Sequence, residues 1–466
     1  MKKISIMTFL LAMVACETQL DIKPKQAIEQ EDALSSDTNL KIVLQAAYDG
    51  LSGFSQNLGS YGFLWGGDIL MFSELLAANG EITWTGTYNQ PREVYGKKML
   101  TNNSFIRANW SGGFYTINIC NNIIANIDKV DEGYRDLVKG SAMFIRGSVY
   151  FELVRFFGKP YSAGNISTNL AVPLMLEGTE VIDENSYSER ATVEQIYQQV
   201  LSDLTQAETL LAQGEESVSE IEDDYSSNDP YATPTAAAAI LSRVYLQMAD
   251  YANARDAADR VIASGRYSLV DDIESEFNNS ANTTEDIFAM QVNEQDGNND
   301  MFVYWSTSEY GARDGDIQIN EKHTDLYDTD DARGKMFYES NGAVRTLKWQ
   351  QQFKILPIVR LAEMYLTRAE ANNRLGTTVG DTPENDVNAI RTRVGLGDLT
   401  NPTLDEILLE RKLELAFEGS AIHDLKRLKG SADGKSYDDN LMVFPVPARD
   451  ISANPNLVQN DGYSDN

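Results

Sequence analysis

The stretch that decides the fold is residues 357–371, which read PIVRLAEMYLTRAEA. Four of its side chains recur at steps of three, four and four residues: Ile358, Leu361, Tyr365 and Ala369. This spacing is typical of a helix with one buried face. Glu363 and Arg368 lie off that face, so we expect them at the helix surface or beside polar neighbours. The stretch therefore predicts a packed helix in the C-terminal third of the chain.

Three further motifs follow this helix. They are VNAIRTRVGL at 387–396, ERKLELAFEG at 410–419 with Asp424-Leu425, and PVP at 445–447 with NPNLVQN at 454–460 and Gly462-Tyr463. Earlier segments fit the same pattern: Leu20-Asp21, Pro24, residues 110–121 and FELVRFFG at 151–158. Together with residues 357–371, these motifs resemble the SusD/RagB family of outer-membrane nutrient-binding lipoproteins. The resemblance covers essentially the whole mature chain.

Helix signals occur along most of the chain. Apolar residues at helical spacing run from Val138 to Phe156 and stop before Gly158. Residues of the types that begin helices stand at three places: Thr192 with Gln195, Thr233 before Pro234, and Thr403 with Glu406. One turn further along the last of these helices, we expect Arg411 to pair with Glu414 at the surface.

The predicted fold class is mainly α. Small residues in a helix starting at 234, and in a second helix carrying Ala254, Ala257 and Ala258, resemble a tetratricopeptide-like helix pair. Residues 51–109 and 264–352 lack steady periodicity, so we expect loops and short strands there. The resemblance implies a SusD-like fold in which such helix pairs scaffold a loop-rich ligand-binding region.

The N-terminus carries an export signal. Lys2 and Lys3 precede an apolar run from Ile4 to Val14, whose helical length of about 16 Å is too short for about 30 Å of hydrocarbon. We therefore expect a signal peptide over 1–15, a lipid on Cys16, a tether over 16–36 and the binding domain over 37–466. The alternative is an ordinary secreted protein cleaved near Ala15.

Composition excludes several classes of function. The sequence has 39 Lys and Arg against 70 Asp and Glu, a net charge of −31, which disfavours nucleic acid and anionic membrane surfaces. Two histidines make a His-rich metal site impossible, and Cys120 is expected to be a small buried residue. The spacing of Asp328, Asp330 and Asp331 does not match an EF-hand loop, so a solvated acidic turn is expected there. We expect no metal and no cofactor.

The resemblance also implies a function. Members of this family are non-enzymatic lipoproteins on the outer-membrane surface, which capture oligosaccharide or polysaccharide and deliver it to a SusC-like TonB-dependent transporter. A peptide-binding importer subunit of the RagB kind shares the scaffold and is the alternative. A glycoside hydrolase is disfavoured, because no pair of carboxylates is singled out by spacing.

A neutral sugar is bound by aromatic faces with amide or hydroxyl neighbours. The first predicted group of binding residues is Trp84, Tyr88, Asn89 and Gln90, and the second is Tyr304, Trp305, Tyr310 and Arg313. Three other tryptophans are expected in the core: Trp65, Trp110 and Trp349. The net negative charge favours a neutral polysaccharide such as a β-glucan as the ligand.

Overall fold

The computed structural model describes residues 30–53, 62–179, 187–219 and 232–464. The predicted signal peptide, Cys16 and most of the tether lie outside the described residues. Within the described part of the chain, no helix is both long and apolar enough to cross a membrane.

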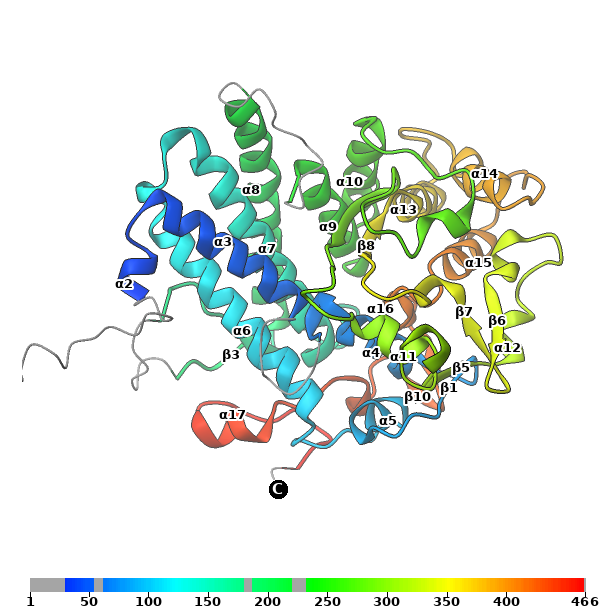
Figure 1. The fold of residues 1–466 in the computed structure, drawn as a ribbon, viewed down its shortest axis with the longest axis horizontal. Helices are drawn as coiled ribbons and strands as arrows, with labels where there is room; N and C mark the ends of the chain where they lie inside the picture. Colours follow the sequence, from blue (N-terminus) through cyan, green and yellow to red (C-terminus); the bar gives the residue numbers. More distant parts are fainter. Residues whose placement is uncertain (1–29, 54–61, 180–186, 220–231, 465–466) are drawn as a thin grey trace, which may run out of the picture.

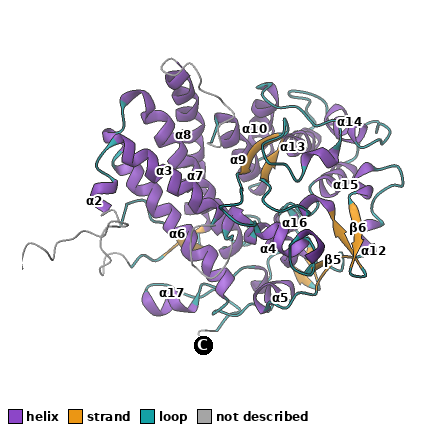
Figure 2. Ribbon diagram, in the orientation of Figure 1, coloured by secondary structure: helices purple, strands orange, loops and turns teal. Residues whose placement is uncertain are grey.

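Helices dominate the fold, with short strands between them (Figure 2). The α-helices are α2 (Gln30–Ala33), α3 (Asp37–Ser52), α4 (Asp68–Ala77), α5 (Asn89–Tyr95), α6 (Ser104–Ala125), α7 (Arg135–Phe157), α8 (Val193–Ser219), α9 (Pro234–Gln247), α10 (Tyr251–Ala263), α11 (Asp300–Trp305), α12 (Glu321–Thr324), α13 (Leu361–Leu375), α14 (Pro383–Arg393), α15 (Leu404–Glu414), α16 (Ala421–Arg427) and α17 (Ala448–Ala453). The mainly α fold class is confirmed.

The strands are β1 (Ile82–Trp84), β2 (Leu170–Pro173), β3 (Arg190–Thr192), β4 (Asp286–Met290), β5 (Ile317–Ile319), β6 (Phe337–Ser340), β7 (Ala343–Thr346), β8 (Leu356–Arg360), β9 (Ser431–Ala432) and β10 (Lys435–Ser436). One antiparallel sheet has the order β1-β5-β7-β6, and the other strands pair as β2-β3, β4-β8 and β9-β10. The four-stranded sheet thus joins a strand near residue 83 to strands more than 200 residues later.

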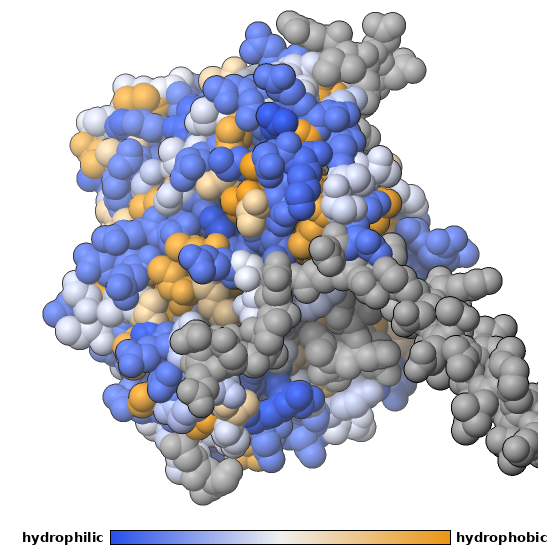
Figure 3. All heavy atoms as spheres, turned by 90° about the vertical axis from the view of Figure 1, so that its left-hand side faces the viewer, coloured by the Kyte–Doolittle hydropathy of each residue, from blue (hydrophilic) through white to orange (hydrophobic). Residues whose placement is uncertain are grey.

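Helices α3, α6, α7 and α8 form one half of the molecule (Figure 1). Helix α7 is its centre and is buried over most of its length. A Cβ on Gly147 of α7 would lie 3.0 Å from Leu204 of α8, so glycine lets the two helices approach closely. Arg146 and Asp203 join them by a buried ion pair of 2.7 Å. The outer side of this half is largely hydrophilic, with scattered hydrophobic patches (Figure 3).

The tetratricopeptide-like pair is present as α9 and α10. Thr233 caps α9 by accepting a hydrogen bond from the Ala236 amide at 3.0 Å, with Pro234 as the first helical residue. The capping boxes of Thr192 with Gln195 and of Thr403 with Glu406 also form, so these predicted helix starts are confirmed.

Residues 357–371 form the end of a strand followed by a helix. Helix α13 begins at Leu361, whereas Ile358 belongs to β8, which pairs with β4. The expected helix start at 357 is therefore wrong by four residues. The β-branched pair Ile358-Val359 suits a strand, and pairing with β4 satisfies its backbone.

Four charged residues of α13 and α15 are buried: Glu363 and Arg368 lie beside polar neighbours, which is one of the two expected places, whereas Arg411 and Glu414 were expected at the surface. Glu363 is 3% exposed and binds Arg243 and Arg411 at 2.5 and 3.1 Å, while Arg368 binds Asp386. The predicted Arg411–Glu414 pair does not form, because Arg411 reaches Glu363 and Asp424. Helix α13 is packed against α10, α14 and α15, so its polar face meets other helices and its charges must be paired.

Two segments differ from the expected loops and tether. Residues 51–109 contain α4 and α5, and α4 was missed because it is buried on all sides and shows no apolar stripe. Packed structure begins before residue 37, inside the expected tether, because α2 forms there and Leu34 is 7% exposed. Of the acidic turn, Asp328 and Asp330 are exposed, whereas Asp331 is buried on Arg333 at 2.8 Å, which corrects the expected solvated turn at that position.

Candidate functional site

The two predicted groups of binding residues meet beside one pair of strands. Strand β1 ends at Trp84 opposite Ile317, the first residue of β5. The amide of Thr85 continues the ladder by donating to the Asp316 carbonyl at 2.8 Å. The chain leaving β1 and the chain entering β5 therefore lie side by side. These two segments are more than 200 residues apart in the sequence.

Tyr304 of α11 connects the two groups. Its ring centroid lies 5.8 Å from that of Trp84 and 6.2 Å from that of Tyr88. Tyr304 itself is 0% exposed. Burial raises the pKa of Tyr304, and the nearby carboxylates of Asp300 and Asp68 raise it further. Its hydroxyl, and the indole nitrogen of Trp84, have no hydrogen-bond partner among the described residues.

Arg313 lies over Tyr88 at the surface of this cluster. The guanidinium carbon is 4.3 Å from the centre of the Tyr88 ring, which is a cation–π contact. Two polar partners hold it there: Asp316 at 2.6 Å and the Thr87 hydroxyl at 2.8 Å. Arg313 and Tyr88 are both half-buried, so part of each is open to solvent.

Asn89 and Gln90 begin α5 beside Tyr88. Asn89 is exposed and accepts a hydrogen bond from Arg92 at 2.9 Å, while Gln90 donates to the Ser104 hydroxyl at 3.2 Å. We define the surface patch as Tyr88, Asn89, Gln90 and Arg313. It combines one aromatic ring with amide and guanidinium groups.

The other predicted aromatics lie differently. Trp84 is 6% exposed and does not present an open ring face. Trp305 is 0% exposed and packs on Phe417 with centroids 4.8 Å apart, so it is a core residue. Tyr310 is half-buried against Tyr338 of β6 at 5.7 Å. The sequence context of Trp84 and Trp305, which is polar and rich in loops, hid their burial.

The three tryptophans expected in the core are there. Trp65 is 1% exposed and donates to Glu152 at 2.9 Å, Trp110 is 3% exposed, and Trp349 is 4% exposed and donates to the Phe417 carbonyl. Cys120 is also buried, as predicted.

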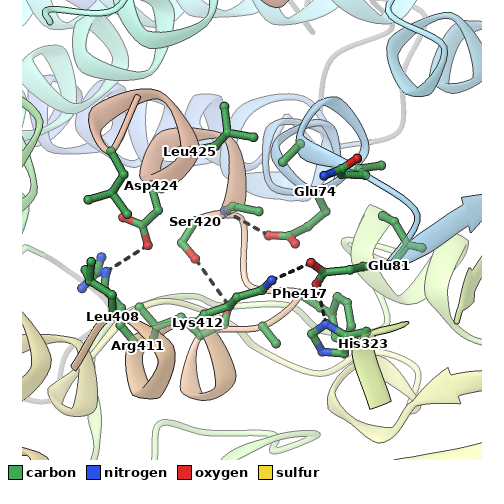
Figure 4. Close-up of a pocket in the computed structure, with 18 of the residues that line it drawn as sticks. Glu74, Glu81, His323, Leu408, Arg411, Lys412, Phe417, Ser420, Asp424 and Leu425 are labelled. Atoms are coloured by element: carbon green, nitrogen blue, oxygen red, sulfur yellow. Dashed lines mark hydrogen bonds and ion pairs between the residues drawn. The ribbon is translucent and has the colours of Figure 1, made fainter. Parts of the chain in front are cut away.

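A pocket of about 420 Å³ lies between α4, α15 and α16, and no sequence motif indicated it. Figure 4 shows its lining side chains pointing toward a shared space. Its apolar wall includes Leu408, Leu409, Leu425 and Leu428. Leu409 and Leu428 are 43% and 38% exposed at its rim. One sequence feature could have indicated this pocket: the leucines on α15 and α16 that lie off the buried faces of those helices.

The charged groups of this pocket are held in internal contacts. Glu81 binds Lys412 at 2.5 Å and His323 at 2.9 Å. Burial alone would raise the pKa of Glu81, but the hydrogen bonds from His323 and Lys412 outweigh it and lower the pKa to about 2. On the opposite side, Asp424 binds Arg411 at 3.0 Å.

Comparison with known proteins assigns the family. Residues 20–246 match a family model described as "Starch-binding associating with outer membrane", and residues 216–441 match the SusD family model. The chain belongs to the SusD/RagB family. The predicted resemblance is thereby confirmed.

Of two SusD-like relatives, one matches this chain over nearly its full length and the other over a part. SusD-like protein P2 of Formosa agariphila is 24% identical over 99% of this chain and 99% of the relative. The starch-binding protein SusD of Bacteroides thetaiotaomicron is 36% identical, over 23% of this chain and 21% of that protein.

Solved SusD structures share the fold. A SusD superfamily protein from Bacteroides thetaiotaomicron superposes with a TM-score of 0.79 at 25% identity, covering 91% of this chain and 99% of the other. Surface glycan-binding protein A from Bacteroides uniformis superposes with a TM-score of 0.74 at 20% identity, covering 91% of this chain and 99% of the other.

Proposed function

We propose that this SusD-like protein binds carbohydrate at the surface patch formed by Tyr88, Asn89, Gln90 and Arg313. The observation that carries the proposal is the meeting of two distant segments at the β1–β5 edge, with Arg313 held 4.3 Å from the Tyr88 ring. Tyr304 and Trp84 support this patch from below, and Tyr310 lies further along the same loop. An aromatic surface with amide donors suits a pyranose ring, whose C–H face stacks while its hydroxyls bond.

The ligand we propose is a neutral polysaccharide such as a β-glucan. A net charge of −31 opposes the approach of a polyanion. The one cation of the patch, Arg313, is already paired with Asp316. Relatives named as starch-binding and surface glycan-binding proteins support a glycan rather than a peptide.

We further propose that the protein is a lipoprotein anchored through Cys16 at the outer-membrane surface, where it passes its ligand to a SusC-like TonB-dependent transporter. The family description, which associates such proteins with the outer membrane, supports this location. Binding and transfer need no covalent chemistry, so we propose a non-enzymatic role.

Calorimetric titration with a panel of neutral polysaccharides tests the proposal. Tyr88→Ala removes the stacking ring and the platform under Arg313, so affinity should fall about tenfold. Tyr115→Ala is the matched control, because Tyr115 is a 45% exposed tyrosine on α6 outside the patch. Affinity for a neutral ligand should change little between low and high salt.

Two results would contradict the proposal. Equal affinity in Tyr88→Ala and Tyr115→Ala would remove the patch as the binding site. Binding of peptides, with no response to any glycan, would favour the RagB-like importer instead.

A further inference from the structure

The pocket between α4, α15 and α16 is separate from the carbohydrate patch. Ile82 at the start of β1 lines the pocket, whereas the patch begins after Trp84 at the other end of that strand. Phe417 forms the inner wall and packs on Trp305 and His323, with centroids 4.8 and 4.5 Å away. A volume of about 420 Å³ is within the range of small-molecule sites.

The charges of the pocket argue against a charged occupant. Glu81 is paired with Lys412 and His323, and Asp424 with Arg411 and Arg427. Glu74 of α4 uses one carboxyl oxygen to accept from the Gly419 amide at 2.9 Å. Burial raises the pKa of Glu74 to about 8, so this group is mostly uncharged at neutral pH. A charged ligand would have to displace one of these pairs.

The walls argue against a sugar. Leucine and alanine are the commonest side chains of the lining, beside the paired charged groups, and the one phenyl ring, Phe417, is 3% exposed and offers no open face. Side-chain amides, which bond sugar hydroxyls, are rare in the lining: Asn79 is the one asparagine or glutamine among its described residues. The leucine and alanine walls, the leucine rim and the paired charges fit an uncharged compound with a large apolar part.

We propose that this pocket is a second binding site, which takes an uncharged, mainly apolar small molecule. The leucines of α15 and α16 contact its apolar part, and the Glu74 side chain of α4 faces its polar group. This proposal stands independently of carbohydrate binding.

Fluorescence titration with N-phenyl-1-naphthylamine, an uncharged aromatic probe, tests it. The full chain carrying Cys16→Ser avoids lipid and detergent, which would themselves take up the probe. We expect saturable enhancement from one site. Ala77→Phe fills the pocket from α4 and should weaken binding about tenfold. Leu425→Ala enlarges the pocket instead of filling it, removes wall contacts, and should weaken binding several-fold.

Ala46→Phe is the matched control, since Ala46 is a half-buried alanine on α3, in the other half of the molecule. It should bind the probe like the parent, as should Tyr88→Ala. Absence of saturable binding, or equal affinity in Ala77→Phe and Ala46→Phe, would overturn the proposal. Displacement of the probe by a neutral oligosaccharide would also overturn it and make the pocket a sugar site.

Discussion

Glu74 shows how one buried residue makes stability depend on pH. It lies on α4 at 6% exposure, where its carboxyl accepts hydrogen bonds from the Gly419 and Ala421 amides at 2.9 and 3.4 Å. Desolvation is the main cause of its raised pKa of about 8. The folded protein therefore holds a proton that the unfolded chain releases above the ordinary glutamate pKa. Stability conferred by this proton is complete below pH 4.5 and is lost as pH rises to about 8.

Glu74→Gln should remove this dependence. The amide oxygen still accepts from Gly419, but the side chain no longer titrates. The free energy of unfolding should then fall less steeply between pH 5 and 8, by at most about 1.4 kcal/mol per pH unit. Urea denaturation across this range measures the slope. Glu309→Gln, a change at an exposed glutamate, is the control and should leave the slope of the parent intact. Equal slopes in the parent, Glu74→Gln and Glu309→Gln would show that Glu74 is ionised throughout the range from pH 5 to 8.

Helix α15 is tied to three other elements by one carboxylate at its last residue. Glu414 binds Arg393 of α14 at 2.5 Å, Arg360 of β8 at 3.2 Å and Arg333 at 3.5 Å. Glu414 is 0% exposed. Burial would raise its pKa, but the surrounding arginines outweigh burial and hold the pKa of Glu414 far below its usual value. This element is therefore positioned by charge pairing as well as by its apolar residues.

Glu414→Gln should destabilise the protein by about 3–5 kcal/mol, because it leaves buried arginines without full compensation. Thermal and urea unfolding measure the loss. Asp405→Asn changes an exposed acid of the same helix and should stay within about 0.5 kcal/mol of the parent. If the two variants were equally stable, the buried network would make no net contribution.

At the scale of the whole molecule, the proposed attachment to a membrane depends on Cys16, which lies outside the described residues. Along the described residues no helix can span a bilayer. Cys16 is the proposed lipid site, so Cys16→Ser should move the protein from the membrane fraction to the soluble secreted fraction. Parent protein extracted in mild detergent should co-purify with a TonB-dependent transporter. Fractionation and pull-down measure both.

Cys120→Ala is the control for this experiment, because Cys120 is buried and carries no proposed lipid. It should remain in the membrane fraction. Retention of Cys16→Ser at parent levels in the outer membrane would refute the anchor, and repeated loss of the transporter would favour a free-standing binder.

Local patterns predicted much of the fold correctly. The capping residues Thr192, Thr233 and Thr403 each begin a helix, and the small residues near 236 and 257 form the predicted pair α9 and α10. These features depend on neighbours within a few residues, because helix caps and helical stripes are short-range. Helix α4 was not predicted, because a helix that is buried on every side shows no apolar stripe at helical spacing.

By itself, the sequence determined the family resemblance, the helical class, the capped helix starts at Thr192, Thr233 and Thr403, and the burial of Trp65, Trp110 and Trp349. Tertiary structure alone decided which candidates share a site. Tyr88 and Arg313 are more than 200 residues apart and meet only because β1 pairs with β5. It also decided burial: Trp84 and Glu414 were expected at the surface, yet strands and helices from distant segments cover them. Period and capping are local properties, whereas burial and convergence depend on packing between distant segments, which no local spacing encodes.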